Sequence, residues 1–162
     1  METSLDLARV EETQRAATWS RTARDFFPGL SVRGLQVNPK LGTMHGQQCG
    51  PGWLWTILSP PLNVTYSPEA AAGERTFSVM LQQEGSTDAR QSSRSCRLNR
   101  HEFCVIDQDT PFELEVAGLF SHLMFLQMPR EAVVSRHPYL EQRTAERLDP
   151  DEPGAMLVRT VL

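Results

Sequence analysis

The segment LNRHEFCVID, residues 98–107, brings His101, Glu102 and Cys104 together in one short stretch. Imidazole, carboxylate and thiol groups can bind a metal ion or transfer protons, so the stretch could begin a metal centre or a catalytic site. A strand, however, points successive side chains to opposite faces, and His101 and Glu102 would then not converge. The other interpretation is a tight turn between two strands that carries reactive side chains.

The remaining histidines give the metal interpretation no support. Metal-binding double-stranded β-helix proteins resemble one another in a compact H-x-H, followed by a Glu and a later His. Here the histidines are dispersed, at positions 45, 101, 122 and 137. A structural zinc site usually needs four nitrogen or sulfur ligands, and clustered pairs of them are absent from the sequence. The sequence therefore predicts no metal site.

Nucleophilic catalysis is also unsupported. The chain has no G-x-S-x-G elbow, and its GPGW segment lacks the Lys and Ser/Thr of a phosphate-binding loop. Cys104 precedes Val105 and Ile106 in an apolar strand, where a buried, inert thiol is expected. We therefore expect no catalytic residue and no cofactor, and the chain is not expected to be an enzyme.

Aromatic side chains give a different kind of candidate site. Trp53 and Trp55 are two residues apart, so on a strand they share a face. They could form a stacking wall for a planar or apolar ligand, or they could simply fill the core. His122, flanked by Phe120 and Met124 at the same alternation, has the same two interpretations.

Composition places the chain among soluble globular proteins. Its 162 residues suit one domain, its apolar content is 40%, and its net charge is −4, which gives no general attraction to nucleic acid or anionic membranes. The chain has no apolar run long enough to span a membrane, and its acidic N-terminus is unlike a secretory signal. Three cysteines without C-x-x-C spacing indicate free thiols, so a cytoplasmic location and no membrane partner are expected.

The elements that would position these side chains follow from periodicity. A helix is predicted over about residues 10–27, since apolar residues recur on one face up to Pro28-Gly29. Short alternating runs separated by turn residues then predict a β-barrel over about 31–128. Proline at position 129 and the Asp149 cap signal predict helices over about 129–162.

Taken in order, these segments resemble the ligand-sensing N-terminal domain of AraC-type transcriptional regulators, in its AraC-binding-like subgroup. The matching stretches are FSVMLQQEG, ARQSSRSCRL, NRHEFCVID, QDTPFELEV and FSHLMFLQMPREAV, and ATWSRTARDFFPGLSV resembles the leading helix of the subgroup. The residues that stand at the positions of the family pattern are Gly85, Leu98, Asp107, Pro111, Phe112, Pro129 and Arg130.

The turn that opened this section departs from the family pattern. Arg100, His101 and Glu102 stand where the family usually has Pro, Gly and Asp. Histidine tolerates a left-handed backbone better than most residues, and Glu102 can accept backbone N–H bonds as turn carboxylates do. The resemblance thus assigns the reactive side chains to a turn between two barrel strands.

The resemblance implies a mainly β, cupin-like double-stranded β-helix barrel of the jelly-roll type, with a leading helix and C-terminal helices. It further implies a single regulatory domain over residues 1–162, which binds a small-molecule effector, forms a homodimer, and controls DNA binding by a C-terminal helix-turn-helix domain outside this chain. Two alternatives remain: a stand-alone cupin-type metal enzyme, and a dimerisation module without a ligand. Alternation and chemistry give the candidate ligand-binding residues, which are Trp53, Trp55, Phe103, Phe120 and His122.

Overall fold

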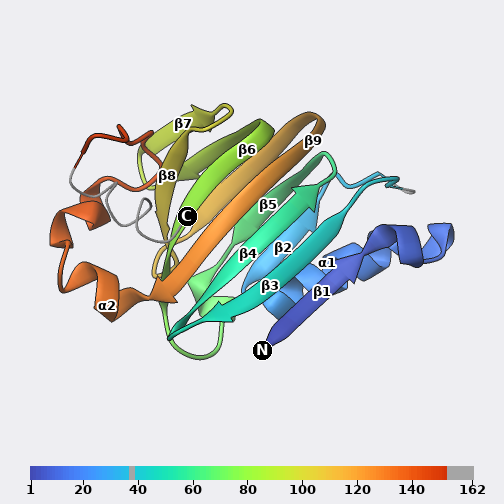
Figure 1. The fold of residues 1–162 in the computed structure, drawn as a ribbon, viewed down its shortest axis with the longest axis horizontal. Helices are drawn as coiled ribbons and strands as arrows, with labels where there is room; N and C mark the ends of the chain where they lie inside the picture. The colour runs from blue at the N-terminus through green and yellow to red at the C-terminus, as the bar shows by residue number, and fades with distance from the viewer. Residues whose placement is uncertain (37–38, 153–162) are drawn as a thin grey trace.

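Two long strands, β6 (Thr76–Gln91) and β9 (Phe112–Pro129), run antiparallel through the fold and organise it (Figure 1). The computed structural model describes residues 1–36 and 39–152. Sequence periodicity predicts separate strands at FELEV and LFSHLMFLQM, but both segments belong to β9. β6 and β9 pair along almost their whole length, so they supply the central strands of the structure.

Both long strands bend near their middle. Gly85 in β6 and Gly118 in β9 adopt φ angles of +75° and +76°, in the left-handed region that favours glycine. The pairing between the strands shifts at the same place, between Gln82 and Glu84 and again between Gly85 and Thr87. A Cβ atom on Gly85 would lie 2.3 Å from the backbone oxygen of Phe120, so no larger residue fits there without displacement. The bend divides each strand between two sheets.

Each half of the bent pair is extended by further strands. The first sheet contains β1, β3, β4, the second half of β9, the first half of β6, and β8. The second sheet contains β2, β5, the first half of β9, the second half of β6, and β7. The bounds of the shorter strands are β1 Glu2–Asp6, β2 Leu30–Arg33, β3 Thr43–Cys49, β4 Gly52–Ser59, β5 Leu62–Tyr66, β7 Arg94–Leu98 and β8 Phe103–Asp107.

The mainly β, jelly-roll fold class predicted from the sequence is confirmed. The strands of the described residues form one continuous antiparallel sheet, and the bends in β6 and β9 fold it into the two halves called here the first and second sheets, which both line the core. The barrel is not closed: among the described residues, the edge strands of the two sheets do not pair with each other. Two strands were not predicted. The segments of β1 and β3 are too polar to show a clear alternation, and they pair with each other at one edge of the first sheet.

Helix α1 (Arg15–Phe26) is the predicted leading helix, and it follows the 3-10 turns Leu7–Arg9 (η1) and Glu12–Gln14 (η2). Trp19 and Ala23 are buried on its inner face, four residues apart as helical geometry requires. Figure 1 shows α1 beside β1, β2 and β3, at the end of the structure away from α2. The helix therefore packs on one side of the two sheets.

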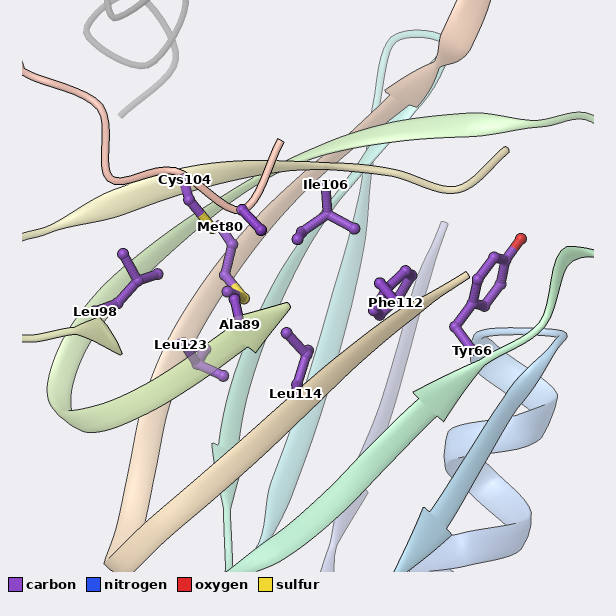
Figure 2. Packing of buried hydrophobic residues seen from close by; sticks show 10 residues of the cluster. Tyr66, Met80, Ala89, Leu98, Cys104, Ile106, Phe112, Leu114 and Leu123 are labelled. Atoms are coloured by element: carbon purple, nitrogen blue, oxygen red, sulfur yellow. The ribbon is translucent and has the colours of Figure 1, made fainter. Parts of the chain in front are cut away.

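The opposite end of the core, the filled end, is packed by side chains alone. Met80, Ala89, Leu98 and Cys104 have no solvent exposure and belong to one apolar cluster. Figure 2 shows Leu98, Cys104 and Met80 gathered on one side of this cluster and Tyr66 with Phe112 on the other. The cluster connects the filled end with the residues near α1.

The segment after β9 lies along the outside of β8. It contains α2 (Arg130–Val134), shorter than predicted, and the 3-10 helix Pro138–Gln142 (η4). The backbone N–H groups of Ala145 and Leu148 donate to the carbonyls of Val105 and Phe103, each at 3.0 Å.

Oδ1 of Asp149 accepts a hydrogen bond of 3.0 Å from the N–H of Asp151, as an N-cap residue does, but residues 150–152 form a turn and a bend and not the predicted first turn of a helix. A capping box would place the Glu152 side chain on the N–H of Asp149, but Glu152 pairs with Arg143 at 3.0 Å. The rest of this predicted helix falls on residues 153–162, outside the described residues.

Candidate ligand-binding cavity

A cavity of about 300 Å³ lies between the two sheets and α1. Its lining side chains come from α1, from strands of both sheets, and from the loop residues Ala71–Arg75 and Gln108. We call the part of the core around this cavity the hollow end. Its volume lies at the lower limit of the range usual for small-molecule sites.

Most of the cavity wall is aromatic or aliphatic. The aromatic side chains in the wall are Trp19, Phe26, Phe27, Trp53, Tyr66, Phe112 and Phe125. Tyr66 and Phe112 stack with ring centroids 4.7 Å apart, and Phe27 packs against Phe125 at 6.4 Å. Such rings provide rigid apolar surface at little cost in conformational entropy.

A polar strip crosses this wall. The hydroxyls of Ser78 and Thr76 both donate to Oε1 of Gln108, the first at 2.9 Å. Gln127 donates through Nε2 to the Thr76 hydroxyl at 3.2 Å, and its Oε1 accepts from the Trp55 indole N–H at 3.2 Å. The Nε2 group of Gln108 has no hydrogen-bond acceptor among the described residues, so its N–H groups are available to a molecule in the cavity.

The charged side chains of the described cavity wall are Glu74 and Arg75, both in the loop before β6. Arg75 lies 3.7 Å from the carboxylate of Asp109 and is partly exposed. Burial raises the pKa of the Tyr66 phenol above its usual value, and the neighbouring Arg75 guanidinium opposes that shift. Tyr66 therefore stays a neutral hydroxyl, which donates to the backbone oxygen of Gln108 at 2.7 Å.

The residue before Gln108 is held on several sides. The side-chain amide of Gln91 bonds both backbone groups of Asp107, at 2.6 Å to its oxygen and 3.0 Å from its nitrogen. The Asp107 carboxylate, with 7% of its side chain exposed, receives Nε and Nη2 of Arg130 at 2.9 and 3.0 Å. These hydrogen bonds raise the pKa of Arg130 further, so its guanidinium group stays charged. Arg130 also binds Glu141, and we call this group of three the Arg130 clamp.

Of the two tryptophans predicted to bind a ligand, one lines the cavity and the other lies behind it. Trp53 lines the cavity. Trp55 is 3% exposed and stacks on Trp53 at 5.4 Å, with Phe26 and Phe27 against it. It reaches the polar strip through Gln127 but does not line the cavity itself. Contact of a ligand with either tryptophan stays a prediction.

Phe103, Phe120 and His122 do not line the cavity. Phe103 is buried on the outer face of β8, against Val133 and Leu148 of the C-terminal segment. His122 alternates with Ser121 and Leu123, whose buried side chains point inward, so the strand turns His122 outward. These three residues therefore lie outside the wall of this cavity, and their contact with a ligand stays an untested prediction.

The residues that sequence analysis missed are the polar ones. Gln108, Thr76, Ser78 and Gln127 are ordinary residue types without a motif, and Gln108 lies in a turn. One signal was available: Ser78 falls on the same face of β6 as the buried Met80, where an apolar side chain would be expected. A small polar residue on a core-facing position is compatible with a cavity.

The turn at His101 is confirmed. His101 has φ +69°, and the Glu102 carboxylate accepts a 2.8 Å hydrogen bond from the N–H of Asn99. Cys104 is fully buried as predicted, and its pKa is raised by a hydrogen bond with Cys96 and by burial. Within residues 1–36 and 39–152, no three His, Cys, Asp or Glu side chains are grouped so that they could hold a metal ion.

Comparison with known proteins identifies the family. The family model described as the AraC-binding-like domain matches residues 13–162 of this chain. The chain belongs to the AraC-binding-like domain family. A curated protein from Bacillus sp. (strain OxB-1), described as an uncharacterised protein in the nit 5′ region, is 26% identical over 137 residues, which are 83% of this chain and 53% of that protein.

Among solved structures, the AraC-like transcriptional activator CuxR superposes with a TM-score of 0.80 at 15% identity, covering 99% of this chain and 59% of CuxR. This likeness shows that the AraC-binding-like chain shares the fold of part of CuxR. A cupin domain of Schizosaccharomyces pombe Cnp3 is more distant, with a TM-score of 0.47 at 8% identity over 62% of this chain and 70% of that one. The chain spans 53% of the Bacillus protein and 59% of CuxR. No helix among the described residues is long and apolar enough to cross a membrane.

Proposed function

We propose that this AraC-binding-like chain is the effector-sensing domain of an AraC-type transcriptional regulator and that its effector binds in the cavity of the hollow end. The observation that carries the proposal is the cavity itself, about 300 Å³ in a core whose other end is filled. A dimerisation module without a ligand would gain stability by filling this space with larger side chains. Homodimer formation, and DNA binding by a part of the regulator outside this chain, belong to the same proposal.

The contacts around Asp107 and Gln108 suggest how the cavity communicates with the rest of a regulator. Gln108 faces the cavity, while the adjacent Asp107 holds Arg130 at the start of the C-terminal segment. Gln108 is bonded in the chain directly to Asp107 of the Arg130 clamp, so a ligand that moves Gln108 also acts on the clamp. If the ligand binds one arrangement of the C-terminal segment more tightly than the others, binding increases the population of that arrangement, to the extent that the affinities differ.

The proposal is tested with the chain and two matched variants. Val64 lines the cavity from β5, whereas the neighbouring Asn63 is exposed on the other face of that strand. Val64→Trp fills the cavity, and Asn63→Trp adds the same ring outside it. A panel of neutral aromatic compounds, aromatic acids, sugars and nucleotides is screened by thermal shift and then by calorimetry.

At a ligand concentration of about 100 Kd, binding stabilises the folded chain by about 2.7 kcal/mol, a clear rise in Tm. We expect at least one compound to raise the Tm of the wild-type chain and of Asn63→Trp but not of Val64→Trp. If no compound binds, or if Val64→Trp responds like the wild type, the cavity is not an effector site. In the complete regulator, Val64→Trp is expected to abolish the response of a promoter reporter to that compound.

A further inference from the structure

The cavity wall also narrows the chemical class of its ligand, an inference that rests on the proposed function. Three features decide it: the volume, the distribution of polar groups, and the state of the charged groups. Each of them excludes some classes of effector.

Volume sets the first limit. An apolar cavity of about 150 Å³ is large enough for benzene. The cavity of about 300 Å³ therefore has room for one ring and a substituent of comparable size. A dinucleotide or a long acyl chain is too large to be contained within this volume.

The polar groups set the second limit. Gln108, Ser78, Thr76 and Gln127 form one strip, while α1, β2, β5 and the first half of β9 offer mainly apolar side chains. The other neutral polar side chains of the wall already have hydrogen-bond partners: Ser59 bonds to the oxygen of Pro60, Tyr66 to the oxygen of Gln108, and Thr87 pairs with Ser121. A sugar carries hydroxyls around its whole ring, and those facing the apolar side chains would lose their hydrogen bonds to water without replacement. An aromatic ring meets the phenyl, indole and phenol groups without that cost.

The free donor in the strip indicates what the substituent must supply. Oε1 of Gln108 already accepts from two hydroxyls, while its Nε2 has no acceptor among the described residues. A carbonyl oxygen on the ligand would satisfy this donor. The ligand therefore needs one hydrogen-bond acceptor near Gln108.

Charge sets the third limit. Arg75 already lies close to the Asp109 carboxylate, and Glu74 is exposed. No uncompensated charge thus faces the interior from the described wall, and a charged group buried there would keep its full desolvation cost. We propose that the effector is a neutral, single-ring aromatic compound with a short side chain that carries a carbonyl-type acceptor, which binds Nε2 of Gln108.

Four probes test the class by calorimetry: phenylacetamide, ethylbenzene, phenylacetate and D-glucose. Phenylacetamide has the ring, the acceptor and no charge, and it should bind most tightly. Ethylbenzene lacks the acceptor, phenylacetate adds a negative charge, and D-glucose lacks the aromatic ring. We expect each of these three to bind at least about tenfold more weakly, the effect of one lost hydrogen bond or more.

The variant Gln108→Leu tests the assigned donor. It should weaken the binding of phenylacetamide about tenfold and leave the affinity for ethylbenzene unchanged, because only phenylacetamide accepts a hydrogen bond from the Nε2 group. A loss that is equal for both probes would mean that the variant deforms the cavity and that Gln108 does not recognise the acceptor. Gln108→Glu, which retains the acceptor for Ser78 and Thr76, serves as the second variant if Gln108→Leu does not fold.

The outcomes separate this inference from the proposed function. Tighter binding of phenylacetate would show that Arg75 recognises an anion, and tighter binding of D-glucose would overturn the aromatic class. If none of the four probes binds but a sugar or nucleotide of the wider panel does, the ligand class is wrong and the sensing function stands. If no compound of any class binds, the proposed function itself fails.

Discussion

The filled end and the hollow end of the core are built from the same strands. On β6, Met80 and Ser78 are two residues apart and point to the same interior, yet Met80 is packed on all sides while Ser78 borders the cavity. On β8, Cys104 belongs to the filled end and Ile106 borders the cavity.

This contrast separates stability from function within one domain. Close-packed side chains at the filled end provide the contacts that hold the two sheets together. At the hollow end the side chains around the cavity lack such packing contacts on one side, and Gln108, Ser78 and Thr76 form a hydrogen-bonded strip there. A region that is less well packed than its surroundings, and lined by ordered polar groups, is suited to binding a ligand.

Shortening one core side chain at the filled end and one at the hollow end should give the largest difference in the free energy of unfolding. Met80→Ala opens a new void in the filled end, and we expect it to lower the free energy of unfolding by about 2–5 kcal/mol. Leu114→Ala, at the wall of the hollow end, should cost less because Leu114 already lacks neighbours on its cavity side. Urea unfolding measures both, and equal costs would mean that the two ends are packed alike.

The Arg130 clamp connects the hollow end to the C-terminal segment. Arg130→Met would leave the carboxylate of Asp107 buried without its partner, and we expect a loss of about 2–3 kcal/mol. Arg90→Met is the control. The ion pairs of Arg90 with Glu113 and Glu115 are exposed, and their removal should change stability by less than about 1 kcal/mol. Chemical unfolding of both variants compares the pairs, and a similar cost would argue against a special role for the clamp.

Trp53→Ala should change binding more than stability. Its side chain is only partly buried and borders the cavity, so we expect phenylacetamide binding to weaken about tenfold while the domain stays folded. Leu98→Val, in the filled end, should leave the affinity unchanged. Calorimetry measures both affinities, and an unchanged Kd in Trp53→Ala would remove Trp53 from the binding site.

The smallest effect is expected on the outer surface, away from both ends. A hydrogen bond from Arg97 lowers the pKa of Asp88 below its usual value. Because the folded pKa is the lower one, the contribution of this pair is present above the unfolded pKa and is lost as the pH falls through the folded pKa. In Arg97→Gln, NMR titration should show the Asp88 pKa rising towards its usual value, with almost no change in Tm at neutral pH. A pKa that did not move would assign the shift to another cause.

Local patterns predicted much of the fold. The helix ending at Pro28-Gly29, the turn at His101 and the strands β4, β5 and β8 each follow from a few neighbouring residues. β1 and β3 could not be predicted in this way, because they are polar edge strands stabilised mainly by their pairing. The union of FELEV and LFSHLMFLQM into β9 was also missed, because Gly118 between them indicates a turn.

The candidate site was harder to predict than the fold. Trp53 was found because paired tryptophans stand out in a sequence, whereas Gln108 has no distinguishing neighbours. Its role depends on hydroxyls from β6 and a phenol from β5, which are distant in the chain. Only the folded arrangement brings these groups to one cavity.

The amino-acid sequence by itself determined the fold class, the family and the alternation of the strands outside β1 and β3. It did not determine which face of a strand points inward. On β9, Leu114 and Val116 face the core at even positions, but beyond the bend at Gly118 the inward residues are Leu123 and Phe125, at odd positions. Extra residues at a bend reverse the alternation, and the pairing of β9 with β6 decides how many residues the bend contains. For this physical reason, tertiary structure alone could turn His122 outward and leave a cavity beside Trp53.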